Sequence, residues 1–271
     1  MAVIVAASCG VAALQQVPRA TVSLDDPPAQ RWTPAMKAML AVHSIDDSVG
    51  AVLAMYEPLM KLLPADTGDR LVAAIKTQAP TRLQELQGIA AFGATVGLSV
   101  NVTTLAMFYY FYELMHINAL REKAEKVLGT EAMPWRRSCT GILSLPEDRS
   151  MPILHGRNMD ESPHQGRNMT ALIDVVKGGK LLYQILDWTW ITTGFFTTQR
   201  YGGVSMEMNW RNQGSFTYDD IMARIEDPNS RPFVHVFRAI QEAKLDFDTA
   251  VQHIVTEQNI APFYIIMTGT H

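Results

Sequence analysis

The chain has 271 residues, 48% hydrophobic and 18% charged, which is too apolar for an intrinsically disordered protein. Its net charge is -4, with 12 Lys+Arg against 12 Asp+Glu in residues 1–138 and 11 against 15 in residues 139–271. Neither half is basic, so we expect no nucleic-acid partner. Two cysteines exclude a disulfide scaffold, and no cluster of His, Cys, Asp and Glu has metal-ligand spacing, so we predict no metal and no other cofactor.

The N-terminus begins with a short apolar segment, residues 1–14, which has the length of a signal-peptide core. Val11-Ala-Ala13 is a candidate cleavage site, although no basic residues precede the segment. A frayed apolar terminus is the alternative interpretation. Glycosylation sequons at Asn101 and Asn168 fit a secretory route.

The first half is predicted to be helical, because apolar residues recur at three- and four-residue spacing. The expected helices cover residues 35–42, 46–63, 69–78, 81–92 and 98–128. Residues 98–120 are rich in apolar side chains, but Glu113 near the middle favours a buried helix over a membrane span. Residues 129–138 contain Gly129 and Pro134 and mark an exposed boundary.

The second half is predicted to combine strands and helices. We expect strands over residues 139–145, 151–157, 171–176, 181–190, 203–208 and 261–267. Helices are expected over residues 218–226, 233–243 and 248–256, the last with Asp248 as its N-cap. This order of elements predicts an α+β fold with a mainly antiparallel sheet.

The first two strands form a hairpin that carries candidate catalytic residues. With the turn centred on Asp148, Cys139 lies opposite Arg157, within one or two residues. Arginine stabilises a thiolate or a developing oxyanion, and Asp160 follows just beyond the second strand. His155 alternates onto the same face as Arg157 and is interpreted as a packed, hydrogen-bonded side chain. From these residues alone, a small core residue is the better explanation of Cys139 than a nucleophile.

Several sequence segments resemble the family of acid ceramidase and N-acylethanolamine acid amidase. Cys139-Thr-Gly-Ile-Leu143 followed by His155-Gly-Arg-Asn-Met-Asp160 is similar to the start of the family's catalytic subunit. Similar segments occur in family order at Leu24-Asp-Asp-Pro-Pro28, Gln87-Gly-Ile-Ala-Ala91, Phe111-Tyr-Glu-Leu114 and Ala261-Pro-Phe-Tyr264.

The resemblance implies an N-terminal-nucleophile hydrolase with an αββα core preceded by a helical α-subunit. Residues 15–138 would form the α-subunit and residues 139–271 the catalytic β-subunit, and the two fragments would stay together after self-cleavage between Ser138 and Cys139. It further implies that Cys139 is the nucleophile and that Arg157 and Asp160 are active-site residues. The substrates would be N-acyl lipids, the enzyme would contact membranes peripherally, and its location would be the lysosome or the secretory pathway.

Four downstream residues are candidates for substrate binding: Trp188, Trp190, Glu207 and Asn209. The two tryptophans could line an acyl pocket, although for either one alone ordinary core packing is the favoured explanation.

The sequence also departs from the family pattern. An insertion of about residues 115–138 lengthens the cleavage loop, and no Thr-Asn-Tyr-Asp motif occurs before His271. The resemblance therefore implies a catalytic subunit and a core that are incomplete at the C-terminus. Three alternatives to a ceramidase stay open: an N-acylethanolamine amidase, an amidase for another N-acyl compound, and an inactive truncated relative that binds lipids.

Overall fold

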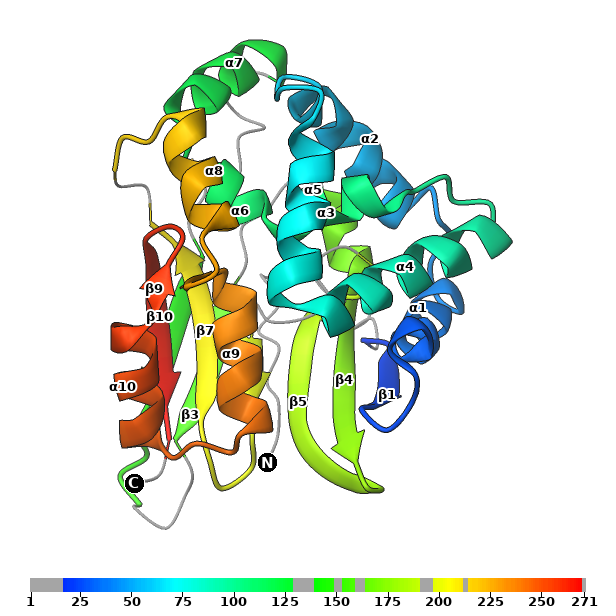
Figure 1. Ribbon diagram of the computed structural model, residues 1–271. Coiled ribbons are helices and arrows are strands. Elements are labelled where there is room, and N and C mark those ends of the chain that lie inside the picture. The colour runs from blue at the N-terminus through cyan, green and yellow to red at the C-terminus, as the bar shows by residue number, and fades with distance from the viewer. Residues whose placement is uncertain are drawn as a thin grey trace.

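The computed structural model describes residues 17–128, 139–148, 153–158, 164–190, 197–211 and 214–269. Its centre is a six-stranded sheet in the order β1-β4-β5-β6-β7-β10 (Figure 1). The strands are β1 (Arg19–Ser23), β4 (Thr170–Lys177), β5 (Lys180–Trp188), β6 (Thr197–Gln199), β7 (Ser205–Trp210) and β10 (Phe263–Thr268). Neighbouring strands of this sheet run antiparallel except β1 and β4, which are parallel. This confirms the predicted α+β class.

The first half supplies mainly helices, as predicted. They are the short η1 (Pro28–Gln30) and the helices α1 (Thr33–Leu40), α2 (Val49–Met60), α3 (Thr67–Gln78), α4 (Pro80–Thr95), α5 (Val102–Tyr109), α6 (Phe111–Leu114) and α7 (Asn118–Leu128). In Figure 1 α1 to α5 gather around the end of the sheet formed by β1, β4 and β5, whereas α6 and α7 lie near α8. Strand β1 was not predicted; it pairs with β4, so the two halves of the chain share one sheet.

The single helix predicted over residues 98–128 is wrong. Asn101 caps α5 by accepting a hydrogen bond from the Thr104 N–H, and the chain then turns at Tyr110 and again before α7. At the second turn Ile117 forms a β-bridge with Phe216, a tertiary contact that ends the helix. Within the described ranges, no helix is long and apolar enough to cross a bilayer.

The later helices are α8 (Tyr218–Glu226), α9 (Phe233–Glu242) and α10 (Phe247–Thr256), with the short strands β8 (Ser230–Arg231) and β9 (Gln258–Asn259) beside them. A capping box between Thr217 and Asp220 starts α8. The predicted N-cap Asp248 is wrong: Asp246 accepts the hydrogen bond from the Thr249 N–H, and α10 begins one residue earlier. Both residues are aspartates, so residue type alone did not show which of the two caps the helix.

The sheet lies between two layers. Helix α9 covers one face, and the hairpin of β2 (Thr140–Ser144) and β3 (Leu154–Asn158) lies on the other (Figure 1). The side chains of β7 alternate accordingly, since Glu207 meets Gly141 of the hairpin while Met206 and Met208 are buried on the opposite face. Strand β6, which was not predicted, carries only three residues between β5 and β7.

Candidate active site at the Cys139 hairpin

The hairpin brings Cys139 and Arg157 together, although in a different register from the one predicted. Gly141, two residues past Cys139, lies opposite Arg157. This shift of two residues is within the expected error, and it keeps both side chains on one face because strand side chains alternate with period two. The Arg157 Nη2 donates to the Cys139 Sγ at 3.3 Å.

Arg157 also attaches the hairpin to the sheet. The same Nη2 donates to the Met208 carbonyl oxygen of β7 at 2.9 Å. The guanidinium is therefore held from two sides, and its charge is directed toward sulfur. A fixed guanidinium at this distance stabilises negative charge on the thiol or on an oxygen that forms beside it.

His155, two residues before Arg157, lies between the hairpin and the sheet. Its Nε2 is 3.1 Å from the Glu207 Oε2, and its Nδ1 is 2.8 Å from the Ser205 Oγ. Its side chain is only 3% exposed and that of Glu207 is fully buried. This agrees with the interpretation of His155 as packed and hydrogen-bonded rather than as the base for Cys139.

Glu207 and Asn209 extend this polar row along β7. A Cβ atom on Gly141 would lie 1.9 Å from the Glu207 Oε1, so the absence of a side chain at residue 141 lets the carboxylate fit beneath β2. The Asn209 Nδ2 is 3.4 Å from the Glu207 Oε1, and within the described parts of the chain its buried Oδ1 accepts no hydrogen bond. A buried amide with unused hydrogen-bonding capacity is suited to binding a polar substrate group.

The sequence reasoning missed the pairing of His155 with Glu207. Alternation along each strand placed His155 on the same face as Arg157, and it also places Glu207 on the same face as Asn209. Nothing local indicates that the hairpin lies over β7, because the two segments are far apart in the chain.

The two candidate tryptophans lie at the same end of the sheet as Asn209. Leu186 of β5, Thr197 of β6 and Glu207 of β7 lie side by side across the sheet. Because β5 and β7 are both antiparallel to β6, they run in the same direction. Trp188 and Asn209, each two residues further along its strand, therefore lie at the same level of the sheet. Trp188 packs over Gly166, where an added Cβ would lie 2.5 Å from its ring. Trp190 is fully buried with its ring centroid 5.7 Å from that of Phe92. Both are core residues, and their role in substrate binding stays a prediction.

The remaining candidates are distributed as follows. Ser138 and Asp160 lie outside the described residues. Asn101 is exposed, with its side-chain oxygen used as a helix cap, whereas the Asn168 Nδ2 donates to the Asp47 carbonyl oxygen at 2.7 Å. A glycan on Asn168 would therefore displace a tertiary hydrogen bond. The described segments contain no group of three His, Cys, Asp or Glu residues able to hold a metal ion.

Comparison with known proteins finds relatives over nearly the whole chain, while no family model matches it. The N-acylethanolamine-hydrolyzing acid amidase of Caenorhabditis elegans is 25% identical over 258 residues, covering 92% of this chain and 63% of that protein. The acid ceramidase of Mus musculus is 24% identical over 271 residues, and that of Bos taurus 22% over 270, each covering 93% of this chain. These two matches span 61% and 60% of the relatives' own lengths.

The comparisons thus identify the two kinds of protein that the motifs indicated. The chain spans about three fifths of the length of the curated relatives it matches. The predicted resemblance is confirmed: this chain is similar, along more than nine tenths of its length, to hydrolases named acid ceramidase and N-acylethanolamine-hydrolyzing acid amidase.

Proposed function

We propose that this protein hydrolyses the amide bond of N-acyl lipids through Cys139, with ceramide as the preferred substrate. The observation that carries the proposal is the 3.3 Å contact between the Arg157 Nη2 and the Cys139 Sγ. That contact lies at the start of a hairpin, within a chain that is similar to acid amidase and ceramidase hydrolases. We assign the fold to the N-terminal-nucleophile hydrolases on the same grounds.

The first step of the proposed mechanism is self-cleavage. The Cys139 thiol attacks the Ser138 carbonyl carbon, the peptide C–N bond breaks, and a thioester forms while the α-amino group of Cys139 is released. Water then hydrolyses the thioester, leaving Ser138 as a new C-terminus and Cys139 as a new N-terminus. The free α-amino group, whose reference pKa is about 7.7–8.0, becomes a local base.

The second step is turnover of substrate. The α-amino group accepts the thiol proton, and sulfur attacks the amide carbonyl carbon of the lipid. Arg157 stabilises the negative charge that develops beside it, and the proton passes to the departing amine. Water then attacks the thioester and releases the fatty acid. Asp160 would hold the α-amino group in place.

Mass spectrometry of the purified full chain, incubated in acidic buffer, tests the first step. We expect two fragments that separate between Ser138 and Cys139, and none from Cys139→Ala. The matched control is Glu147→Ala, an exposed change in the same hairpin, which should still be cleaved. Cleavage at another bond, or cleavage of Cys139→Ala, would overturn the assignment.

Hydrolysis assays on the same samples identify the substrate. Release of fatty acid from an N-acylsphingosine faster than from an N-acylethanolamine of equal acyl length supports the ceramidase proposal. The reverse order would favour the N-acylethanolamine amidase, and hydrolysis of N-acyl bile salts alone would favour an amidase of another class.

An inactive, lipid-binding relative is the alternative to the amidase. It predicts no cleavage and no hydrolysis, together with co-sedimentation with ceramide-containing vesicles.

Peripheral membrane contact belongs to both proposals. Val42 and Val127 are candidate contacts, because they are 49% and 51% exposed on the helical part. Lysosomal or secretory localisation also stays a proposal, and its candidate signal, residues 1–14, lies outside the described residues.

A further inference from the structure

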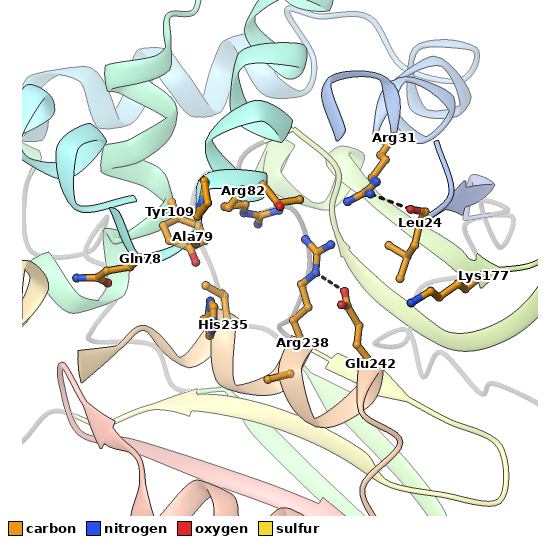
Figure 2. A pocket seen from close by; sticks show the side chains of 14 residues that line it. Leu24, Arg31, Gln78, Ala79, Arg82, Tyr109, Lys177, His235, Arg238 and Glu242 are labelled. Atoms are coloured by element: carbon orange, nitrogen blue, oxygen red, sulfur yellow. Dashed lines mark hydrogen bonds and ion pairs between the residues drawn. The ribbon is translucent and has the colours of Figure 1, made fainter. Parts of the chain in front are cut away.

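A cavity of about 490 Å³ lies away from Cys139, between the helical first half and the later part of the chain (Figure 2). Arg31 and Arg82 line it from the first half. Lys177 at the end of β4 and Arg238 of α9 line it from the second. The cavity is therefore enclosed by segments on both sides of the predicted cleavage site.

Three guanidinium groups beside this cavity share one carboxylate. Glu85 is 3.1 Å from Arg31, 2.7 Å from Arg82 and 2.8 Å from Arg238, measured between side-chain oxygen and nitrogen atoms. Burial alone would raise the pKa of Glu85, but the charges of Arg238 and Arg82 outweigh it and lower the pKa to about 2. The carboxylate is therefore ionised and offsets one of the three positive charges.

The lining of the cavity keeps an excess of positive charge. Glu242 pairs with the Arg238 Nε and is the acidic residue of the lining, while Lys177 adds a further cation. Four cations thus face two carboxylates, counting Glu85 behind the lining. Asp25 accepts a hydrogen bond from the Gly178 N–H next to Lys177, but it does not line the cavity.

Two further observations indicate positive potential in the cavity. The N-terminus of α4 opens into it through Pro80 and Thr81, with no side-chain cap and no acidic residue in its first turn. His235 on the opposite wall has its pKa lowered to about 4 by burial and by the charges of Arg231, Arg238 and Arg82. Each of these groups would gain from a bound anion.

We propose that this cavity binds the phosphate group of an organic phosphate, either a free metabolite or a lipid headgroup. The excess of about two positive charges matches a phosphate that carries about -1.5 to -2 at neutral pH. Guanidinium forks are suited to its oxygens, and buried excess charge is costly without a counter-ion. A volume of 490 Å³ also leaves room for the organic part.

Because residues from both parts of the chain line the cavity, a bound ligand would link these two parts. A phosphate held by Arg31 and Arg238 contacts both fragments that self-cleavage would produce. Bound ligand would therefore hold the two fragments together, in addition to the direct ion pair between Glu85 and Arg238.

Calorimetric titration of the full chain with glycerol 3-phosphate and with inorganic phosphate tests the proposal. The Cys139→Ala variant serves as the host, so the result is independent of cleavage and hydrolysis. We expect saturable binding that weakens about tenfold in Lys177→Glu, a loss of about 1.4 kcal/mol. Lys37→Glu, which changes the same charge on an exposed residue outside the lining, should bind like the host.

A second readout separates a specific site from general charge attraction. Because bound phosphate favours the imidazolium, NMR titration should show the pKa of His235 rising from about 4 when glycerol 3-phosphate is added. His235→Gln identifies the resonance. Vesicles of phosphatidylcholine with phosphatidic acid, compared with phosphatidylcholine alone, distinguish a lipid headgroup from a free phosphate. Absence of saturable binding to every phosphate probe, equal weakening in both charge-reversal variants, or an unchanged His235 pKa would overturn the proposal.

Discussion

Two regions of this molecule bury a carboxylate in different surroundings. Glu85 lies in the helical part, where three arginines surround it. Glu207 lies under the Cys139 hairpin, where its partners are one histidine and one amide. Burial alone therefore does not determine what an acidic group does. Permanent cations make Glu85 part of a fixed ion network. Glu207 instead has one imidazole and one amide as partners, and it lies beneath the hairpin that carries Cys139.

Replacing Glu85 by Gln should have the largest effect on stability. The change leaves three guanidinium groups without their shared carboxylate, which should lower the free energy of unfolding by about 3–5 kcal/mol. Urea denaturation at neutral pH measures it. Glu57→Gln is the matched control, because its ion pair with Lys61 is exposed and should contribute at most about 0.5 kcal/mol. Equal effects of the two substitutions would show that the network is not stabilising.

A third buried carboxylate sharpens the comparison. Glu113 is fully buried, and burial raises its pKa to about 8 although the backbone N–H groups of Glu113 and Phe233 oppose the shift. Its contribution to stability is present in full below pH 4.5, its unperturbed pKa, and is lost as the pH rises through 8. The span corresponds to a loss on the order of 5 kcal/mol.

Thermal or urea unfolding between pH 4.5 and 8 measures this contribution. Glu113→Gln cannot ionise, so its stability should depend much less on pH between 6.5 and 8, above the range in which His235 contributes. Glu122→Gln on exposed α7 is the control and should keep the wild-type slope. The decisive range is pH 6.5 to 8, because His235, whose pKa is lowered to about 4, and Glu85 contribute slopes of the opposite sign below pH 6.5 and below about pH 4.5 respectively. A wild-type stability that rises with pH between 6.5 and 8 would contradict the assignment.

At the hairpin, Arg157→Gln tests whether the guanidinium serves chemistry. Under the proposed function, kcat/KM for the N-acyl lipid should fall about 100- to 1000-fold, as for loss of one oxyanion donor. Arg157→Lys should recover part of the rate, because it restores the charge without the fork. Activity unchanged by Arg157→Gln, in protein that is folded by circular dichroism, would remove Arg157 from the mechanism.

The smallest predicted effect concerns how the hairpin fits over β7. Gly141→Ala would place a Cβ 1.9 Å from the Glu207 Oε1 and should destabilise the protein by about 1–3 kcal/mol. Gly156→Ala, on the paired strand, is the matched control because no atom lies within 4 Å of the added Cβ. If the two alanine variants unfold at the same urea concentration, the hairpin does not lie on Glu207 as described.

Local features of the sequence predicted much of the fold and the central part of the site. Turn residues between two apolar runs indicated the hairpin, and period-two alternation placed Cys139 and Arg157 on one face even with the register shifted by two. Helix α8 was predicted with its observed bounds, and the capping box that starts it is formed by residues only three apart in the sequence.

The tertiary structure alone decided which distant segments meet. β1 pairs with β4 across about 150 residues, and Arg238 reaches Glu85 from a helix 153 residues away in the chain. The same holds for His155 and Glu207, which are brought together only when the hairpin settles on β7. Periodicity and capping act within a few residues and specify elements. Burying apolar faces and pairing charges act across the whole chain, so the sites built from such contacts become visible only in the folded protein.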